Sequence, residues 1–177
     1  TVYVVGPSST GKTTLCNALA AQLGLLHEVY VTEVARTVMR EHAFTREEVH
    51  TQAMQEAIAH AHVAREKEAR RVAAEHGSLV LCDRCALDAV VYGMLNSEAQ
   101  GQILMDIPTI RGALEDYRSA WAHVVLLAPV ADWMVDDGVR SMQDGETCVE
   151  MYRLLLRELR IAYLEVGEDC RPLEDRV

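Results

Sequence analysis

A loop motif near the amino terminus constrains this chain more than any other feature. The run Gly6–Thr14 spells GPSSTGKTT and matches the pattern G-x-x-x-x-G-K-[ST] of phosphate-binding loops (P-loops). The apolar run Val2–Val5 before it is typical of a buried strand, and apolar residues at helical spacing follow it over Leu15–Leu23. A strand, a glycine loop and a helix in this order direct backbone N–H groups and a helix N-terminus at a polyphosphate. The sequence therefore predicts a nucleotide-phosphate site on an α/β fold.

The residue types in this loop suit contact with a phosphate chain. Gly6 and Gly11 allow backbone conformations and close approaches that a Cβ would prevent. Lys12 supplies a point charge for the β- and γ-phosphates, and the Thr13 hydroxyl is placed to ligate Mg²⁺. The residues predicted to contact the nucleotide here are Gly6, Ser8, Ser9, Thr10, Gly11, Lys12, Thr13 and Thr14. The motif does not define what happens to the phosphate.

Composition limits the class of protein. A chain of 177 residues suffices for one α/β domain and is too short for two, so we expect a single domain over residues 1–177, with the question of flanking domains left open. The net charge of −10 favours a small-molecule or protein partner over nucleic acid. The sequence has no membrane-length apolar run and no secretory leader, and its five cysteines lack paired spacing. We therefore expect a cytoplasmic protein without a membrane span.

Continuous apolar runs recur along the chain, separated by helical patterns. After the first strand we expect further strands over 27–32, 78–83, 124–128 and 161–166. Uninterrupted apolar runs are typical of strands covered on both faces. A long helix is expected from the capping box of Thr45 and Glu48 to about His76, with its interspersed charges, Glu66 among them, on a solvent-facing side. The pattern predicts an α/β fold with a five-stranded, mostly parallel sheet and helices on both faces.

An acidic and a basic residue follow the third predicted strand. Asp83 comes at the carboxyl end of this strand, where α/β sheets place ligand contacts, and suits a carboxylate that holds Mg²⁺. Arg84 comes next and could reach a transferring phosphate. Asp83 and Arg84 could instead form an ordinary ion pair at the end of the strand. The presence of the P-loop favours the functional interpretation.

Glu33 and Arg36 follow the second predicted strand with E-x-x-R spacing. Residues three apart share a face of a first helical turn, so both side chains could point above the P-loop. Glu33 could accept a proton from a substrate hydroxyl, and Arg36 could bind an anionic group of the substrate. An ordinary pair at a helix start fits the spacing equally well.

Two later segments suit contact with a bound nucleotide. Arg140, at the end of an acidic run after the fourth strand, could close over the phosphates, and Asp136 and Asp137 could position substrate, Mg²⁺ or a lid. An acidic loop before a helix fits this run almost as well. Gly167 follows the fifth strand, and topology places it beside the nucleotide base.

The remaining metal-binding residue types give a weaker signal. The seven histidines show no convincing metal spacing, and we expect them to face solvent or to be satisfied by hydrogen bonds. Cys82 and Cys85 have the spacing of half a zinc or redox site but have no second pair, and Cys82 falls inside an apolar strand. We therefore interpret both cysteines as small buried residues.

Four segments, taken in order, resemble one family. The P-loop, Thr32–Arg36, Cys82–Arg84 and Val135–Arg140 are together similar to the AAA-like P-loop family that unites the nicotinamide riboside kinase domain of NadR with the TRP translocation-defect GTP-binding proteins. The resemblance covers nearly the whole chain. It implies a nucleoside-kinase-like fold with a lid, in which ATP and Mg²⁺ deliver a γ-phosphoryl group to a hydroxyl acceptor. It also implies site roles for Glu33, Arg36 and Arg140.

The two branches of that family leave the acceptor open. Asp136–Arg140 resembles the lid of the nicotinamide riboside kinase branch, whereas Asp83–Ala89 looks more like the translocation-defect branch. Our first hypothesis is a P-loop kinase that acts on a small ribosyl or nucleoside-type hydroxyl. A polynucleotide 5′-kinase is an alternative, because E-x-x-R beside a P-loop can position a 5′-hydroxyl. A nucleotide-dependent switch with slow hydrolysis is another, and the absence of an N-K-x-D motif weakens a preference for GTP.

The first hypothesis assigns a role to each candidate residue. Lys12 and the loop hold the phosphates, Thr13 and Asp83 ligate Mg²⁺, and either Glu33 or Asp83 is the base. The predicted catalytic residues are Lys12, Glu33, Arg36, Asp83, Arg84 and Arg140, and Arg140 and Gly167 join the loop in binding the nucleotide. The oligomeric state is left open.

Overall fold

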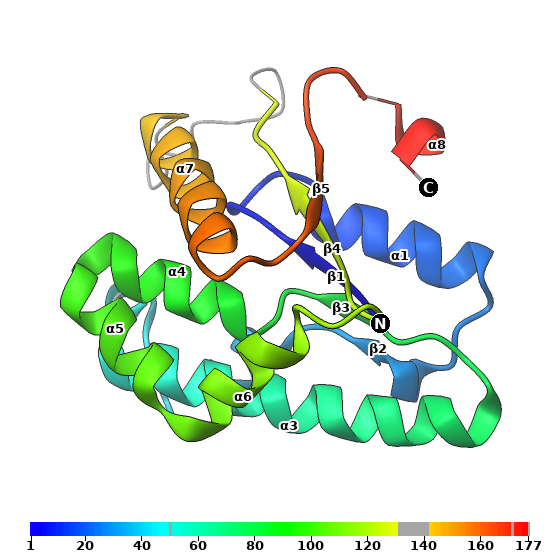
Figure 1. Cartoon of the computed structure of the whole chain (residues 1–177), viewed down its shortest axis with the longest axis horizontal. Coiled ribbons are helices and arrows are strands. Elements are labelled where there is room, and N and C mark those ends of the chain that lie inside the picture. Colours follow the sequence, from blue (N-terminus) through cyan, green and yellow to red (C-terminus); the bar gives the residue numbers. More distant parts are fainter. Residues whose placement is uncertain (50, 131–141, 171, 177) are drawn as a thin grey trace.

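The predicted strands form one sheet (Figure 1). In the computed structural model, which describes residues 1–49, 51–130, 142–170 and 172–176, the strands pair in the order β2-β3-β1-β4-β5. They are β1 (Val2–Val5), β2 (Tyr30–Val31), β3 (Leu81–Asp83), β4 (His123–Leu127) and β5 (Tyr163–Val166). Every pairing is parallel, so the described sheet is parallel throughout rather than mostly parallel.

Helices occupy the connections between the strands. They are α1 (Lys12–Gln22), α2 (Val34–Glu41), α3 (Gln52–His76), α4 (Ala86–Asn96), α5 (Glu98–Asp106), α6 (Pro108–Asp116), α7 (Met142–Glu158) and α8 (Leu173–Arg176), with short 3-10 turns η1 (His27–Val29) and η2 (Arg46–Glu48). No described helix is both long enough and apolar enough to cross a membrane.

The second strand and the long helix are both shorter than predicted. Residues 27–29 form η1, so β2 keeps only the two residues that pair with β3. The Thr45 amide and hydroxyl do bond the Glu48 carboxylate, at 2.8 and 3.0 Å, but this contact closes η2 rather than starting α3. The helix begins one turn later at Gln52, where the Thr51 hydroxyl accepts a bond from the Met54 amide. Two competing caps within seven residues thus account for the difference.

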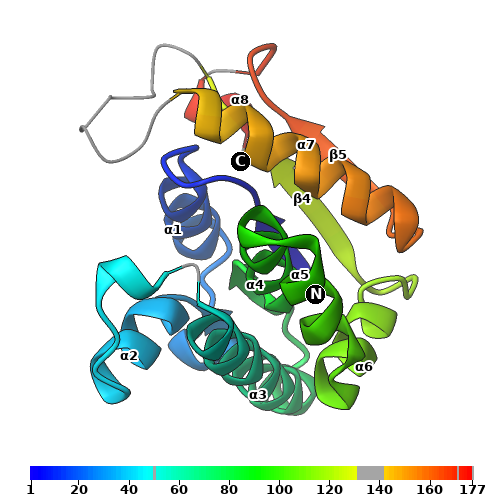
Figure 2. The same cartoon turned by 90° about the vertical axis from the view of Figure 1, so that its left-hand side faces the viewer.

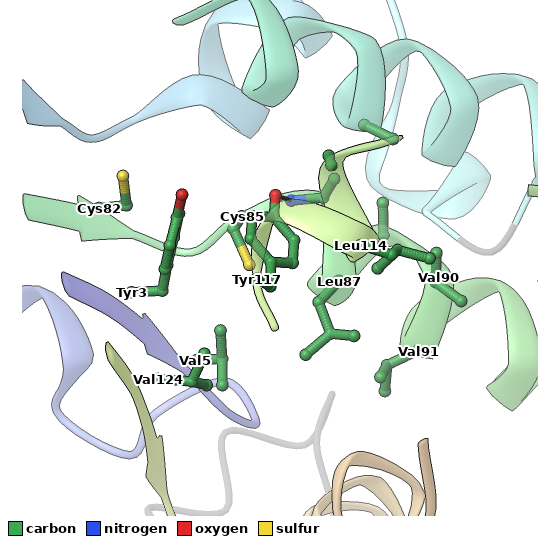
Figure 3. Packing of buried hydrophobic residues seen from close by; sticks show 14 of the residues in the cluster. Tyr3, Val5, Cys82, Cys85, Leu87, Val90, Val91, Leu114, Tyr117 and Val124 are labelled. Carbon is green, nitrogen blue, oxygen red and sulfur yellow. Dashed lines mark hydrogen bonds between the residues drawn. The ribbon is translucent and has the colours of Figure 1, made fainter. Parts of the chain in front are cut away.

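Helices lie on both sides of the sheet (Figure 2), and each face of the sheet packs into its own hydrophobic layer. Successive strand residues point to opposite faces, and helix α1 covers one face with Leu15 and Cys16 against Val4, Leu81 and Leu127. The other face packs against α3, α4, α6 and α7. Figure 3 shows Tyr3 of β1 and Tyr117, just after α6, on this second side, where their ring centroids lie 4.6 Å apart. The prediction of helices on both faces is therefore confirmed.

The second layer also contains a buried carboxyl group. Glu66 of α3 is fully buried, although its helix pattern predicts a solvent-facing side chain. The Tyr117 hydroxyl donates to both Glu66 oxygens at 3.0 Å and accepts a bond from the Ala86 amide at 3.1 Å. Burial raises the pKa of Glu66 to about 8. This network holds Ala86, the first residue of α4, two residues after Arg84.

Candidate active site

The P-loop is bent sharply at the carboxyl end of β1. Gly6 has φ +139° and Gly11 has φ +84°, conformations that L side chains rarely adopt. A Cβ at Gly6 would lie 2.4 Å from the Leu127 carbonyl oxygen, so only glycine fits between the loop and the end of β4. Helix α1 begins at Lys12, immediately after the bend. The structure therefore places the loop and a helix N-terminus at one point, as the motif predicts.

Lys12 is buried beside its own loop. Its Nζ donates to the Pro7 carbonyl oxygen and, at 3.1 Å, to the Thr10 hydroxyl, and only 4% of the residue is exposed. Burial, together with the nearby charge of Arg84, lowers the pKa of Lys12 to about 7. Within the part of the chain that the structure describes, this ammonium has no salt-bridge partner. A polyphosphate at the loop would supply one and would raise the pKa again.

Thr13 and Asp83 meet across 70 residues of sequence. The Thr13 hydroxyl donates to Asp83 Oδ2 at 2.6 Å. The second oxygen, Oδ1, is buried and has no hydrogen-bond partner among the described residues, and burial raises the pKa of Asp83. A buried, unpaired carboxylate oxygen beside a threonine hydroxyl is a donor set that suits Mg²⁺, which prefers oxygen ligands and is commonly held by one or two carboxylates plus substrate phosphates. These two residues therefore fit the predicted metal site.

Arg84 lies against the P-loop in a left-handed backbone conformation. Its φ is +75°, its amide donates to the Val4 carbonyl oxygen at 3.0 Å, and its Nη1 donates to the Gly6 carbonyl oxygen at 3.2 Å. The side chain is 24% exposed, so it lies at the surface of the site rather than within the core. The structure thus brings Arg84 to the loop, together with Lys12 and Asp83.

Helix α4 contributes two site residues that the sequence analysis missed. Asp88 accepts a bond from Arg84 at 2.8 Å, and the Tyr92 hydroxyl lies 3.0 Å from Ser8 Oγ in the loop. The Arg84 guanidinium carbon also lies 5.8 Å from the centroid of the Tyr92 ring. The spacing of four between Asp88 and Tyr92 is a signal that could have found them, because residues four apart share a face of a helix such as α4.

Glu33 and Arg36 form a hydrogen bond with each other at the start of α2. Glu33 caps α2 with φ +58°, and Arg36 Nη1 bonds Glu33 Oε2 at 2.8 Å, with both side chains largely exposed. Their side-chain hydrogen bond in the described structure is with each other and not with the P-loop. The structure therefore shows the helix-start pair without a direct contact to Lys12, Thr13 or Asp83.

Gly167 lines a cavity at the carboxyl ends of β4 and β5. The cavity has a volume of about 380 Å³ and is bordered by Ala128, Pro129, Glu146, Arg153, Glu165, Gly167, Glu168 and Asp169. A Cβ at Gly167 would lie 3.1 Å from the Cβ of Ala128. Arg140, with Asp136 and Asp137, lies outside the described residues, and so does the rest of the predicted lid.

The cysteines and one histidine complete the comparison with the sequence predictions. Cys82 and Cys85 are free and buried, and within the described ranges no cluster of three or more His, Cys, Asp or Glu side chains could hold a metal ion. His62 of α3 departs from the prediction for histidines. It is 1% exposed, its Nδ1 has no hydrogen-bond partner in the described part of the chain, and burial lowers its pKa to about 4.

The chain matches a known protein family. A family model described as "AAA domain" matches residues 1–176. The chain belongs to this AAA domain family. The assignment agrees with the AAA-like P-loop resemblance carried by the four sequence segments. No curated protein matches the chain.

Solved structures show which folds this AAA domain is similar to. A NadR protein in complex with NR superposes with a TM-score of 0.65 at 24% identity, over 93% of this chain and 44% of that one. Two structures of deoxyadenosine kinase from M. mycoides, one with bound dCTP and one with the products dCMP and a flexible dCDP, give TM-scores of 0.59 and 0.61 at 13% and 12% identity. Each covers 99% of this chain, and 94% and 93% of the kinase chain respectively. This AAA domain therefore has the P-loop fold of nucleoside kinases, and it spans less than half of the NadR chain.

Proposed function

We propose that this chain is an ATP- and Mg²⁺-dependent phosphotransferase that moves the γ-phosphate to a hydroxyl of a small ribosyl or nucleoside-type acceptor. The observation that carries the proposal is the meeting of Lys12, Thr13, Asp83 and Arg84 at one bend of the P-loop. The similarity in fold to NadR and to deoxyadenosine kinase supports a nucleoside-type acceptor. We also propose that residues 1–177 form a single kinase-like domain.

In this proposal each residue acts on a different part of the phosphate chain. Lys12 binds the β- and γ-phosphates together with the loop amides. Thr13 and Asp83 Oδ1 would hold Mg²⁺, which neutralises charge on the phosphate oxygens. Arg84 binds the γ-phosphate as negative charge spreads over it, and Arg140 is the second candidate for this role. Because phosphoryl transfer depends chiefly on electrostatic stabilisation, loss of one such arginine is expected to lower the rate on the order of 10³-fold.

The base is assigned to Glu33 rather than to Asp83. Asp83 Oδ2 already accepts the Thr13 bond and its Oδ1 is the proposed metal ligand, so neither oxygen is left for the acceptor hydroxyl. Glu33 is exposed, and its partner Arg36 could take an anionic group of the acceptor. Since the side chains of the pair bond each other and not the loop, the acceptor would lie between the pair and the phosphates.

The cavity beside Gly167 is proposed to receive the nucleotide base. Its volume suits a small ligand, and it lies at the carboxyl edge of the sheet, where α/β folds bind nucleotides. Arg153 is paired with Glu150 and Glu165, so the remaining lining is rich in carboxylates. Such a lining accepts hydrogen bonds from amino groups of a base.

The deciding experiment is transfer of labelled γ-phosphate from ATP with Mg²⁺ to nicotinamide riboside, common nucleosides and a 5′-hydroxyl oligonucleotide. Transfer to a nucleoside-type acceptor supports the proposal, and Glu33→Ala should then abolish transfer while nucleotide affinity stays within about threefold. Normal transfer by that variant would remove Glu33 from the mechanism. Transfer to the oligonucleotide alone would replace the proposal with a polynucleotide 5′-kinase. Tight nucleotide binding with slow hydrolysis and no transfer would replace it with a nucleotide-dependent switch.

A further inference from the structure

The carboxylate of Asp88 joins three separate parts of the chain. Its Oδ1 accepts bonds from Arg84 Nη1 at 2.8 Å and from the Tyr152 hydroxyl at 2.7 Å, and its Oδ2 accepts a bond from the Cys85 amide at 3.0 Å. The Asp88 side chain is only 4% exposed. The strand-to-helix turn after β3, helix α4 and helix α7 therefore meet at one buried anion.

This anion restrains the side chain that faces the P-loop. The same Arg84 Nη1 that bonds Asp88 also bonds the Gly6 carbonyl oxygen at 3.2 Å. A free arginine side chain has many accessible rotamers, so an unrestrained one would lose much of that conformational freedom on binding a phosphate. Arg84 loses it when the protein folds. A donor fixed in advance stabilises developing charge without reorganising during the reaction.

Helix α7 supplies the second restraint. Tyr152 is fully buried, and its hydroxyl donates to Asp88 Oδ1, the same oxygen that accepts the Arg84 bond. The next residue, Arg153, lines the cavity beside Gly167 and bonds Glu165. Helix α7 therefore contacts both the carboxylate that holds Arg84 and the cavity beside Gly167.

We propose that Asp88 and Tyr152 are positioning residues: Asp88 holds the Arg84 guanidinium against the P-loop, and Tyr152 holds Asp88 from α7. The inference rests on the proposed phosphotransferase function for its rate effects. It concerns groups that do not themselves touch the nucleotide, so it extends the set of functional residues beyond those that the loop motif and the strand-end acid define.

A double-mutant cycle tests the proposal. Asp88→Asn keeps the volume of the side chain but removes its charge, and we expect the rate of γ-phosphate transfer to fall about tenfold to a hundredfold with the KM for ATP within threefold. Tyr152→Phe removes one hydroxyl and should lower the rate about fivefold. In an Arg84→Ala background, Asp88→Asn should lower the rate less than about twofold further, because the group it positions is gone.

Tyr3→Phe is the matched control. It removes a buried tyrosine hydroxyl that accepts a bond from Arg70 at 2.9 Å, away from Asp88. Thermal unfolding measures the stability that each variant loses. We expect Tyr3→Phe and Tyr152→Phe to lose similar stability while only Tyr152→Phe loses rate. Equal rate losses in the two tyrosine variants, or an Asp88→Asn effect that is undiminished in Arg84→Ala, would overturn the proposal.

A second measurement separates this inference from the proposed function. The affinities for Mg·ADP with and without aluminium fluoride, which mimics the transferring phosphoryl group, do not require an acceptor. Asp88→Asn should weaken the fluoride complex about tenfold more than it weakens Mg·ADP, and only when Arg84 is present. If wild type transfers phosphate to nothing but keeps this pattern, the proposed function fails and the positioning role stands. An equal loss of both affinities would overturn the positioning role alone.

Discussion

The two layers that cover the sheet differ in how they are held together. On the α1 side, Leu15 and Cys16 pack against Val4, Leu81 and Leu127, and the buried polar groups Lys12 and Asp83 lie only at the edge of this layer, beside the P-loop. On the side of α3, α4 and α7, the apolar core surrounds polar side chains that are almost fully buried, namely Gln55, His62, Glu66 and Asp88.

This difference separates two tasks. An apolar layer fixes where α1 lies, and that suffices to aim the loop and the helix N-terminus at a phosphate. A buried polar group costs free energy unless it is hydrogen-bonded, so it stabilises only an arrangement that supplies its partners. Glu66 through Tyr117 holds the start of α4, and Asp88 holds Arg84. The polar layer therefore sets the orientation of single groups, whereas the apolar layer sets the position of a helix.

The largest expected effect is at Lys12, on the α1 side of the sheet. A substitution there should remove activity without unfolding the protein. Lys12→Ala should lower turnover on the order of 10³-fold or more, because the point charge on the phosphates is gone. The free energy of unfolding should stay equal or rise, since burial already disfavours the charged form of Lys12. Turnover assays measure the rate, and urea unfolding measures the free energy of unfolding. A collapse of the fold in this variant would mean that the loop also serves as part of the core.

The next largest effect is a pH dependence of stability that comes from the polar layer. The pKa of Glu66 is about 8 in the folded protein and 4.5 as an ordinary glutamate, so the folded state keeps a proton that the unfolded state releases between these values. Its contribution to stability is full below pH 4.5 and is lost as the pH rises through 8, a change on the order of 3 to 5 kcal/mol.

Urea unfolding at several pH values between 5 and 8 measures this change. Glu66→Gln carries no titrating proton at this position, and its stability curve should lack the decline that Glu66 adds to wild type. Parallel curves for the two proteins would show that Glu66 is ionised in the core.

Leu15→Ala is the corresponding test of the apolar layer. Leu15 is 3% exposed, and its truncation should cost about 3 kcal/mol through lost burial and the cavity left behind. This loss should be the same at every pH at which Glu66 titrates, as judged from urea unfolding. A pH-dependent loss would show that the two layers are not independent.

The smallest effect is a proton taken up on nucleotide binding. Because the pKa of Lys12 is about 7 in the free protein and the phosphates favour its charged form, ATP affinity should fall by up to about tenfold per pH unit above 7. Calorimetry in buffers of different ionisation enthalpy measures the proton directly. Lys12→Met should bind more weakly and take up no proton at this site, and unchanged uptake would assign the proton to another group.

The sequence predicted the apolar layer and the P-loop better than the polar layer. The loop motif and the acid after β3 are local signals, and both Thr13 and Asp83 lie where the pattern puts them. Glu66 was predicted to face solvent, because its partner Tyr117 comes 51 residues later and leaves no mark on the helix pattern. Asp88 was missed as a site residue because a cysteine, Cys85, takes the capping position where serine or threonine is usual. The hydrogen bond between Glu33 and Arg36 fits their spacing, but whether the pair reaches the loop depends on the path of α2, which spacing does not encode.

The hydrogen bond between Thr13 and Asp83 has a consequence for how the protein is handled. It links α1 to β3 before any metal arrives, so the two elements are already joined through their own side chains. Magnesium binding then adds a ligand to Asp83 Oδ1, which has no hydrogen-bond partner among the described residues, instead of assembling the site. A preparation stripped with a chelator should for this reason stay folded and keep its shape, which makes the metal-free protein a usable starting point for soaking nucleotides and for measuring each ligand separately.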